Sequence, residues 1–312
     1  MRDSLDSETV GAALVTSDRP WRGVEFHPAL GSTNTRLRDL LTGAATPTGP
    51  YAVSAAERAA DGAAGGAAGG AAGGAPGLWW VVLTDHQTGG RGRLGRAWTV
   101  PDRASLAVSV AVPVTDAAHV GWMPLLAGLA LTRAVREVTR AAGRELTARL
   151  KWPNDVLLAD DGDRKLSGIL CELVTTGAGT PRAAQVVVVG TGVNVDQTRA
   201  ELPVPTATSL ALAGADVRRE ELVVAYLDHL AALLAPAGAA DDDLATARDA
   251  YRAACATIGA QVQVHLPQGG LVSGTAVAVD DHGSLVVRTP GGSRTFAAGD
   301  VVHVRPPGAG LA

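Results

Sequence analysis

The chain has 312 residues, of which 46% are hydrophobic and 19% charged, and its formal net charge at neutral pH is −4. This length fits one large domain, or one with a small partner domain, and the apolar fraction excludes disorder of the whole chain. The net charge argues against a general polyanion binder, although a local basic patch is compatible with it. Only two of the 27 basic residues are lysines, Lys151 and Lys165, which makes their positions informative.

The amino terminus, MRDSLDSETV, is acidic and lacks the basic start and apolar centre of a secretory signal. No apolar run reaches the roughly 18 residues that a membrane helix requires. The two cysteines, Cys171 and Cys255, form no Cys-x-x-Cys pair, so we expect neither a disulfide scaffold nor a cysteine-ligated zinc site. These features predict a soluble, cytoplasmic protein.

The first half of the chain contains helix and strand signals separated by a low-complexity segment. Residues 1–30 show only weak periodicity, whereas Ser32-Thr33-Asn34 can cap a helix that continues through leucines at helical spacing. Residues 59–77 contain three copies of Ala-Ala-Gly-Gly, and this glycine density predicts a flexible surface insertion to which we assign no function. Strands are predicted at 78–84 and 105–112, with a glycine–arginine loop at 89–96.

The second half predicts a helical and hairpin region followed by a small β module. A helix is expected over 122–142, and a hairpin with strands 156–159 and 166–174 around Asp160-Asp161-Gly162. A strand at 185–189 and a second amphipathic helix around 222–234 follow. From Gly259 onward the sequence has only short β-like runs between turn residues, as in a small β-barrel. We therefore predict an α/β (α+β) fold, with a mixed sheet and helices in residues 1–257 and a β domain in 258–312.

The glycine–arginine loop carries the first chemical signal. Gly90-Arg91-Gly92-Arg93-Leu94-Gly95 satisfies the G-x-G-x-x-G pattern, but the residues after it are short and end at Pro101, so no Rossmann helix can open there. The loop can still approach a ligand closely and offer guanidinium groups to phosphate or carboxylate oxygens, while Trp98 can stack on a purine. A solvated basic loop is the alternative interpretation.

The two lysines lie in two further segments. Lys151-Trp152-Pro153-Asn154-Asp155 has the composition of an ordinary turn with a surface charge, and Lys165-Leu166-Ser167-Gly168 that of an ordinary hairpin strand. Because the two segments flank one predicted hairpin, their lysines modestly favour a shared site. Trp152 is expected to be a packing residue.

Five segments together resemble the motif set of the bacterial biotin–protein ligases, of the stand-alone type without a DNA-binding domain. They are Ser32-Thr33-Asn34, Gly90 to Arg96, Lys151 to Asp155, Lys165 to Leu170, and Gly190-Thr191-Gly192-Val193-Asn194. The resemblance covers roughly residues 25–305, and it implies a class II synthetase-like biotin/lipoate ligase catalytic domain with a C-terminal SH3-like β-barrel. The Ala-Gly repeat departs from this family.

The resemblance implies a two-step reaction. Biotin and ATP would give biotinoyl-5′-adenylate and pyrophosphate, and the biotinoyl group would pass to a lysine of a biotin carboxyl carrier protein. A carboxylate that attacks a phosphate needs cations and Mg²⁺ to offset charge repulsion. We therefore expect ATP, biotin and Mg²⁺, with the carrier domain of a carboxylase as partner, and neither a nucleic acid nor a membrane.

The resemblance also assigns roles to individual residues. It implies that biotin is bound by Ser32, Thr33, Asn34, Gln87, Gly90, Arg91, Gly92, Arg93, Lys151, Gly168 and Gly190. It implies that ATP or the adenylate is bound by Arg93, Arg96, Trp98, Lys151 and Asn194. The residues expected to be catalytic are Lys151, Arg93 and Lys165. The general base and the metal ligands stay unassigned, with Asn154 and Asp155 as candidate ligands only.

Three other functions compete with this hypothesis. A lipoate ligase would share much of the motif set, but the Lys151–Asp155 segment and the glycine–arginine loop favour biotin. A biotin-sensing transcriptional repressor would need a helix-turn-helix domain ahead of Ser32, where the sequence shows no pair of amphipathic helices. An inactive biotin-binding module is disfavoured because the expected phosphate-facing cations are present.

Overall fold

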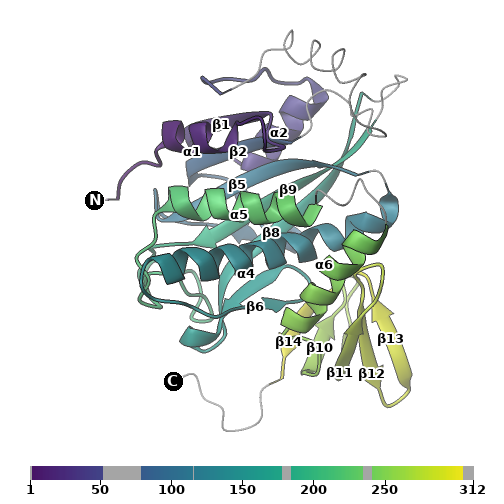
Figure 1. The fold of residues 1–312 in the computed structure, drawn as a ribbon. Helices are drawn as coiled ribbons and strands as arrows, with labels where there is room; N and C mark the ends of the chain where they lie inside the picture. The colour runs from purple at the N-terminus through teal and green to yellow at the C-terminus, as the bar shows by residue number, and fades with distance from the viewer. Residues whose placement is uncertain (1, 52–78, 115, 178–183, 235–240, 305–312) are drawn as a thin grey trace.

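The computed structural model describes residues 2–51, 79–114, 116–177, 184–234 and 241–304. It contains a large sheet with helices on both faces and a smaller sheet formed by the C-terminal part of the chain (Figure 1). The predicted Ala-Gly insertion at 59–77 lies outside the described residues. The predicted helices, the hairpin and the β-rich C-terminal part are all confirmed.

The large sheet has seven strands and is mixed, as predicted. Among the strands that the structure describes in this sheet, only β1 and β2 are parallel, and every other neighbouring pair is antiparallel. The strands, in their order across the sheet, are β1 (Gly23–Leu30), β2 (Trp80–Gln87), β5 (Ser105–Pro113), β9 (Ala184–Asn194), β8 (Arg164–Thr176), β7 (Asp155–Leu158) and β6 (Ala148–Lys151).

Helices cover the two faces of this sheet unequally. One face packs against α4 (Met123–Ala141) and α5 (Arg219–Leu234), with α1 (Ser7–Leu14) beside α5. The opposite face packs against α2 (Thr33–Thr42). The side-chain hydroxyl of Ser32 accepts a hydrogen bond from the backbone N–H of Thr35, so of the three predicted candidates Ser32 is the residue that caps the helix.

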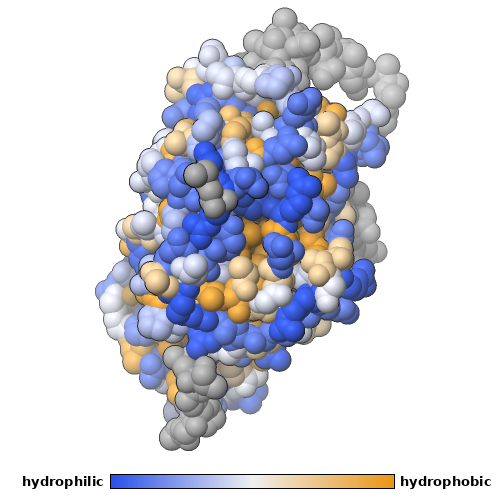
Figure 2. Space-filling model, turned by 90° about the vertical axis from the view of Figure 1, so that its left-hand side faces the viewer, coloured by the Kyte–Doolittle hydropathy of each residue, from blue (hydrophilic) through white to orange (hydrophobic). Residues whose placement is uncertain are grey.

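Side chains alternate between two apolar cores. Along β5, Leu106, Val108 and Val110 belong to the large core under α4 and α5, whereas Ala111 belongs to a small core under α2. This follows from the two-residue period of a strand. Hydrophilic residues cover much of the face shown in Figure 2, with hydrophobic residues gathered near its middle.

The C-terminal sheet is antiparallel and has five strands, in agreement with the SH3-like expectation. The helix α6 (Asp241–Ala254) leads into it. The strands, in their order across the sheet, are β13 (Gly292–Phe296), β12 (Leu285–Thr289), β11 (Leu271–Val279), β10 (Gln261–His265) and β14 (Asp300–His303).

Two buried tryptophans join the C-terminal sheet to the rest of the chain. The indole N–H of Trp122 donates to the carbonyl of Asp281 at 2.8 Å, and that of Trp152 donates to the carbonyl of Gly283 at 2.9 Å. The backbone N–H of Trp152 also donates to the hydroxyl of Thr257. Trp152 is therefore a packing residue, as predicted, and the segment that contains Lys151 is fixed between the two sheets.

The N-terminal residues form elements that the sequence pattern did not predict, helix α1 and the edge strand β1. They are held by long-range contacts. The buried carboxylate of Asp85 accepts hydrogen bonds from the backbone N–H of Leu5 and from Arg219, whose guanidinium lies 2.7 Å away. Among the described residues, no helix is long and apolar enough to cross a membrane.

We predict that Arg219→Met lowers the free energy of unfolding by about 3–5 kcal/mol, because it leaves the Asp85 carboxylate buried without its cation. Urea denaturation measures the change. The neighbouring Arg218, whose side chain is 63% exposed, provides the matched control, and Arg218→Met should stay within about 0.5 kcal/mol of the unsubstituted protein. Equal losses in the two variants would contradict a specific role for the buried pair.

Candidate active site

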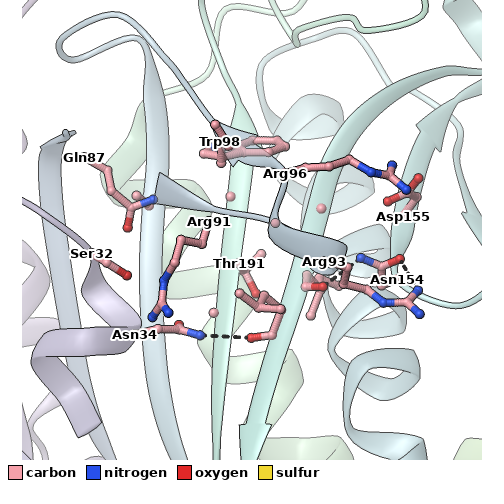
Figure 3. Close-up of a pocket in the computed structure, with 18 of the residues that line it drawn as sticks. Ser32, Asn34, Gln87, Arg91, Arg93, Arg96, Trp98, Asn154, Asp155 and Thr191 are labelled. Atoms are coloured by element: carbon pink, nitrogen blue, oxygen red, sulfur yellow. Dashed lines mark hydrogen bonds between the residues drawn. The ribbon is translucent and has the colours of Figure 1, made fainter. Parts of the chain in front are cut away.

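A cavity lies on the α2 side of the large sheet, beside the glycine–arginine loop (Figure 3). Residues from both sheets and from several loops line it. They are Ser32, Thr33, Asn34, Gln87, Arg91, Gly92, Arg93, Leu94, Arg96, Ala97, Trp98, Ala107, Asn154, Asp155, Lys165, Gly168, Ile169, Leu170, Gly190, Thr191, Gly192 and Asp300.

Small residues on three adjacent strands form one wall of the cavity. Ala107 of β5, Gly192 of β9 and Gly168 of β8 are partners in register, so they form a row across the sheet. A Cβ atom on Gly192 would lie 2.6 Å from the ring of Trp98, a distance that side-chain atoms do not tolerate. The indole of Trp98 therefore packs on the backbone of Gly192, and any residue larger than glycine at position 192 would displace it.

A second row carries the polar end of the cavity. Ser109, Gly190 and Leu170 are partners in register, next to the first row. A Cβ atom on Gly190 would lie 2.0 Å from the side-chain oxygen of Asn34. The missing side chain at Gly190 thus makes room for the Asn34 amide.

Hydrogen bonds fix the polar end. The amide nitrogen of Asn34 donates to the carboxylate of Glu172 at 2.7 Å and to the carbonyl of Leu170. The hydroxyl of Ser109 lies 2.6 Å from the amide oxygen of Asn34 and 2.7 Å from the hydroxyl of Thr33. Thr33 in turn donates to the side-chain oxygen of Gln87. The buried Ser109 therefore connects the two residues that the sequence placed in one motif.

The glycine–arginine loop is a short hairpin in the structure. Its strands β3 (Gly90–Arg91) and β4 (Ala97–Trp98) pair antiparallel around a single turn of 3-10 helix, Arg93–Gly95. A Cβ atom on Gly90 would lie 2.3 Å from the carbonyl oxygen of Trp98, so glycine is required for this pairing. The pairing directs Trp98 over the sheet.

Each arginine of this loop contacts a different element. Arg91 donates to the hydroxyl of Thr35 at 2.9 Å and lies 3.6 Å from the carboxylate of Glu172. Arg93 donates to the side-chain oxygen of Asn154 at 3.2 Å. Arg96 forms an ion pair with Asp300 of β14.

Arg93 is the least exposed of the three arginines. Burial lowers its pKa, while the carboxylates of Asp300 and Asp155 oppose that decrease. An arginine stays protonated under such a shift, so a desolvated positive charge faces the cavity region.

The two lysines differ in their partners. The ammonium group of Lys165 lies 2.6 Å from the carboxylate of Asp155 and 5.9 Å from the ring centroid of Trp98. The ammonium group of Lys151 has no hydrogen bond or ion pair among the described residues. Burial lowers the pKa of Lys151, opposed by Asp155, which is its register partner across β6 and β7. Lys151 therefore holds a desolvated charge that no carboxylate neutralises directly.

The cavity contains most of the residues that the sequence singled out, and three of them do not line it: Gly90, Lys151 and Asn194. Gly90 and Lys151 adjoin lining residues, as described above. The amide of Asn194 is buried and engaged within the protein, where its nitrogen donates to the carbonyl of Thr208 and its oxygen accepts from Gln197.

Sequence reasoning missed several residues of the site: Ala107, Ser109, Gly192 and Asp300. The first two alternate with large apolar residues in the strand Ser105–Pro113, and this alternation of small and large side chains was an available signal. Nothing in the local sequence around Asp300 indicates its position at the cavity.

A metal ion finds few ligands here. Among the described residues, no group of three or more His, Cys, Asp or Glu side chains lies close enough together to hold an ion. Asn154 is engaged with Arg93 and with the carbonyl of Ile169, and Asp155 with Lys165. Any ion bound here would need ligands from a substrate as well.

The cavity is chemically divided. At one end Thr33, Asn34 and Gln87 offer uncharged hydrogen-bonding groups, and at the other Arg93, Lys165 and the nearby Lys151 offer positive charge. Such an arrangement fits a ligand with a neutral polar head and an anionic tail, or two ligands whose anionic groups meet at the cationic end.

Family models match two parts of the chain. Residues 78–194 match the "Biotin/lipoate A/B protein ligase family", and residues 257–304 match the "Biotin protein ligase C terminal domain". The first range includes the glycine–arginine loop, both lysines and strands β5, β8 and β9, and the second includes the C-terminal sheet.

Individual proteins extend the similarity to nearly the whole chain. A biotin–[acetyl-CoA-carboxylase] ligase of Mycobacterium tuberculosis is 35% identical over 308 residues, which cover 98% of each chain. A bifunctional ligase/repressor of Escherichia coli is 37% identical over 156 residues, 49% of this chain and 44% of that protein. The solved biotin protein ligase from Aquifex aeolicus, in complex with biotin and ATP, superposes with a TM-score of 0.64 at 22% identity, covering 92% of this chain and 100% of the other. At that identity the structural match shows a shared fold.

Proposed function

The chain belongs to the family of biotin–[acetyl-CoA-carboxylase] ligases, and on that premise we propose that it biotinylates a carrier protein at the expense of ATP. In the first step the carboxylate of biotin attacks the α-phosphorus of ATP, forming biotinoyl-5′-adenylate and releasing pyrophosphate. In the second step a lysine amine of the carrier attacks the acyl carbon and AMP leaves. The observation that carries the proposal is the divided cavity, with a neutral polar end and a cationic end.

The neutral end suits the ureido head of biotin, which both donates and accepts hydrogen bonds. We assign its recognition to Ser32, Thr33 and Gln87, with Asn34 beside them. The buried hydrogen-bond network through Ser109 supports this assignment, because it fixes the orientation of Thr33 and Asn34. Gly190 gives the backbone room that this network requires.

The cationic end suits the acyl phosphate. Arg93, Lys151 and Lys165 would neutralise the biotin carboxylate and the phosphates, which lowers the repulsion between two anionic reactants. Arg91, Gly90 and Gly92 belong to the hairpin that closes over biotin, and Gly168 leaves space on the facing strand.

Adenylate binding involves a further set of residues. We assign adenine stacking to Trp98, whose indole lies against Gly192, and phosphate binding to Arg96, because both residues line the cavity. The proposal for Asn194 as an adenine contact requires its amide to release Thr208 or Gln197.

We propose that Mg²⁺ enters with ATP. Magnesium is commonly held by one or two carboxylates and by substrate phosphates, which fits a site without a dedicated cluster of acidic residues. Asn154 and Asp155 are the candidate ligands, and the ion would add positive charge at the phosphates. Holding Mg²⁺ would require Asp155 to share or release Lys165.

The partner and the place of action follow from this reaction. The partner would be the carrier domain of a carboxylase, whose lysine must reach the cationic end of the cavity. Cys171 and Cys255 are free thiols, as expected in a reducing compartment, and this supports action in the cytoplasm. We place the boundary between the catalytic domain and the SH3-like domain at residues 257 and 258.

Two alternatives remain testable. The first family model includes lipoate ligases, whereas the C-terminal match is to biotin ligases, and this favours biotin. Some relatives, such as the Escherichia coli protein, are also repressors. Residues 2–31 of this chain form α1 and strand β1 instead of a pair of packed helices, so this segment does not support the repressor function.

The direct experiment incubates the protein with biotin, ATP, MgCl₂ and a carrier domain and determines the mass of the carrier by mass spectrometry. A mass gain of one biotinoyl group that requires ATP is expected. The same reaction with lipoate in place of biotin serves as the comparison. No gain with biotin, or an equal gain with lipoate, would refute the proposed specificity.

For the polar end, we predict that Ser109→Ala weakens biotin binding about tenfold, since it removes a buried hydroxyl that positions Thr33 and Asn34. Isothermal titration calorimetry measures the dissociation constant. Ser167→Ala is the matched control, because it deletes a buried hydroxyl without a partner among the described residues. If both variants bind biotin like the unsubstituted protein, Ser109 has no positioning role.

For the cationic end, we predict that adenylate formation falls at alkaline pH because Lys151 loses its proton. Burial lowers the pKa of Lys151, so its positive charge is present below that pKa and lost as pH rises through it, earlier than for an exposed lysine with a pKa of about 10.4. Biotin-dependent ATP–pyrophosphate exchange, followed against pH, measures this.

Lys151→Arg tests the assignment of that alkaline decrease. A guanidinium stays protonated over the whole range, so the decrease should disappear from the pH profile even if the absolute rate is lower. Lys151→Ala should slow exchange about 100-fold at neutral pH, the usual cost of losing a group that stabilises transition-state charge, and this difference should shrink at alkaline pH as Lys151 of the unsubstituted protein loses its proton. An unchanged alkaline decrease in Lys151→Arg would assign the titration to another group.

A further inference from the structure

The C-terminal sheet contributes one carboxylate to the cavity, that of Asp300 at the start of β14. Its position is fixed by the pairing of β14 with β10, in which Asp300 is the register partner of His265. The hydroxyl of Thr257 lies 3.0 Å from a ring nitrogen of His303, at the other end of β14. Asp300 is thus held at the cavity by the fold of the second domain.

The partner of Asp300 is Arg96 of the glycine–arginine loop. The two side chains are 42% and 57% exposed, and an ion pair that exposed contributes little to the stability of the protein. Because both residues line the cavity, we expect this ion pair to affect ligand binding instead.

The electrostatic effect of Asp300 extends beyond Arg96. It opposes the burial that lowers the pKa of Arg93, and it acts in the same direction on Lys151. Only one other lining residue, Asp155, is acidic, and its carboxylate is paired with Lys165. Asp300 is consequently a negative charge placed where the proposed reaction brings the polyphosphate of ATP.

We propose that Asp300 competes with the phosphates of ATP, and with pyrophosphate, for Arg96. This inference rests on the proposed function, since it concerns the nucleotide end of that site. Before ATP binds, Arg96 is neutralised by Asp300. When ATP binds, the phosphates take Arg96 and Asp300 is released. After adenylate forms, Asp300 recovers Arg96 and so favours the departure of pyrophosphate. Asp300 is therefore a positioning residue that weakens nucleotide binding and speeds product release.

The competition predicts a gain of affinity on removal of the carboxylate. In Asp300→Asn, the KM for ATP and the inhibition constant of pyrophosphate should each fall about three- to tenfold, while the dissociation constant for biotin stays unchanged. A residue that only supports the structure predicts the opposite, a higher KM for both substrates with a lower thermal midpoint. Asp300→Glu keeps the charge and should stay near the unsubstituted protein.

Asp281→Asn is the matched control. Asp281 belongs to the same domain and also pairs with an arginine, Arg252, but its side chain is 82% exposed and does not line the cavity. The substitution changes the net charge by the same amount, so a fall in KM for ATP common to both variants would reflect overall charge and would overturn the proposal.

A double-mutant cycle separates competition for Arg96 from simple repulsion. Arg96→Gln should raise the KM for ATP, and Asp300→Asn should lose most of its effect in that background. An undiminished effect there would overturn the competition.

Binding of inorganic pyrophosphate, measured by calorimetry at constant free Mg²⁺, tests the inference without catalysis. Tighter binding in Asp300→Asn than in Asp281→Asn supports the competition, and equal or weaker binding overturns it. Biotin-dependent exchange by the unsubstituted protein tests the proposed function separately. Its absence would refute that function, and the calorimetry would still decide whether Asp300 opposes an anionic phosphate ligand.

Discussion

Beside the cavity, strands β5, β9 and β8 place large apolar side chains on one face of the sheet and mostly small residues on the other. The large ones form the core under α4 and α5, and the small ones, Ala107, Gly168, Gly190 and Gly192, leave backbone exposed in two adjacent rows. Asn34 lies against one row and Trp98 against the other, each at a distance that a single methyl group would prohibit. The position of the binding site therefore follows from the register of three strands, and the loop and helix residues are arranged around it.

The same site must gather positive charges that repel one another. The structure distributes their partners over separate elements: Arg91 contacts Glu172 on β8, Arg93 contacts Asn154 in the turn after β6, and Arg96 contacts Asp300 on β14. Lys165 has Asp155, whereas Lys151 is kept charged and desolvated without such a partner. These contacts hold the cations in position, and a bound phosphate can replace them. Little reorganisation is therefore needed during the reaction.

The sequence allowed prediction of the elements that depend on local signals. The cap at Ser32, the periodic helix α4 and the hairpin of β7 and β8 each depend on residues close in sequence. Helix α1 and strand β1 depend on distant contacts such as Leu5 with Asp85, and no local pattern records those. The site shows the same division. Motifs indicated its loop and its lysines, but Ser109 enters through strand register and Asp300 through domain docking, which become visible only after folding.

Trp152 couples the C-terminal region to the cavity. Its indole and its backbone both bind the C-terminal region, while Lys151 before it adjoins the cavity and Asn154, two residues after it, lines the cavity. The two domains are therefore not interchangeable modules. In a chimera whose C-terminal sheet came from a relative, the loop that accepts the Trp152 hydrogen bond and the residue that faces Arg96 would both come from the other protein. The turn at Trp152, the loop that carries Asp281 and Gly283, and the start of β14 are therefore structurally coupled, although they lie far apart in the sequence.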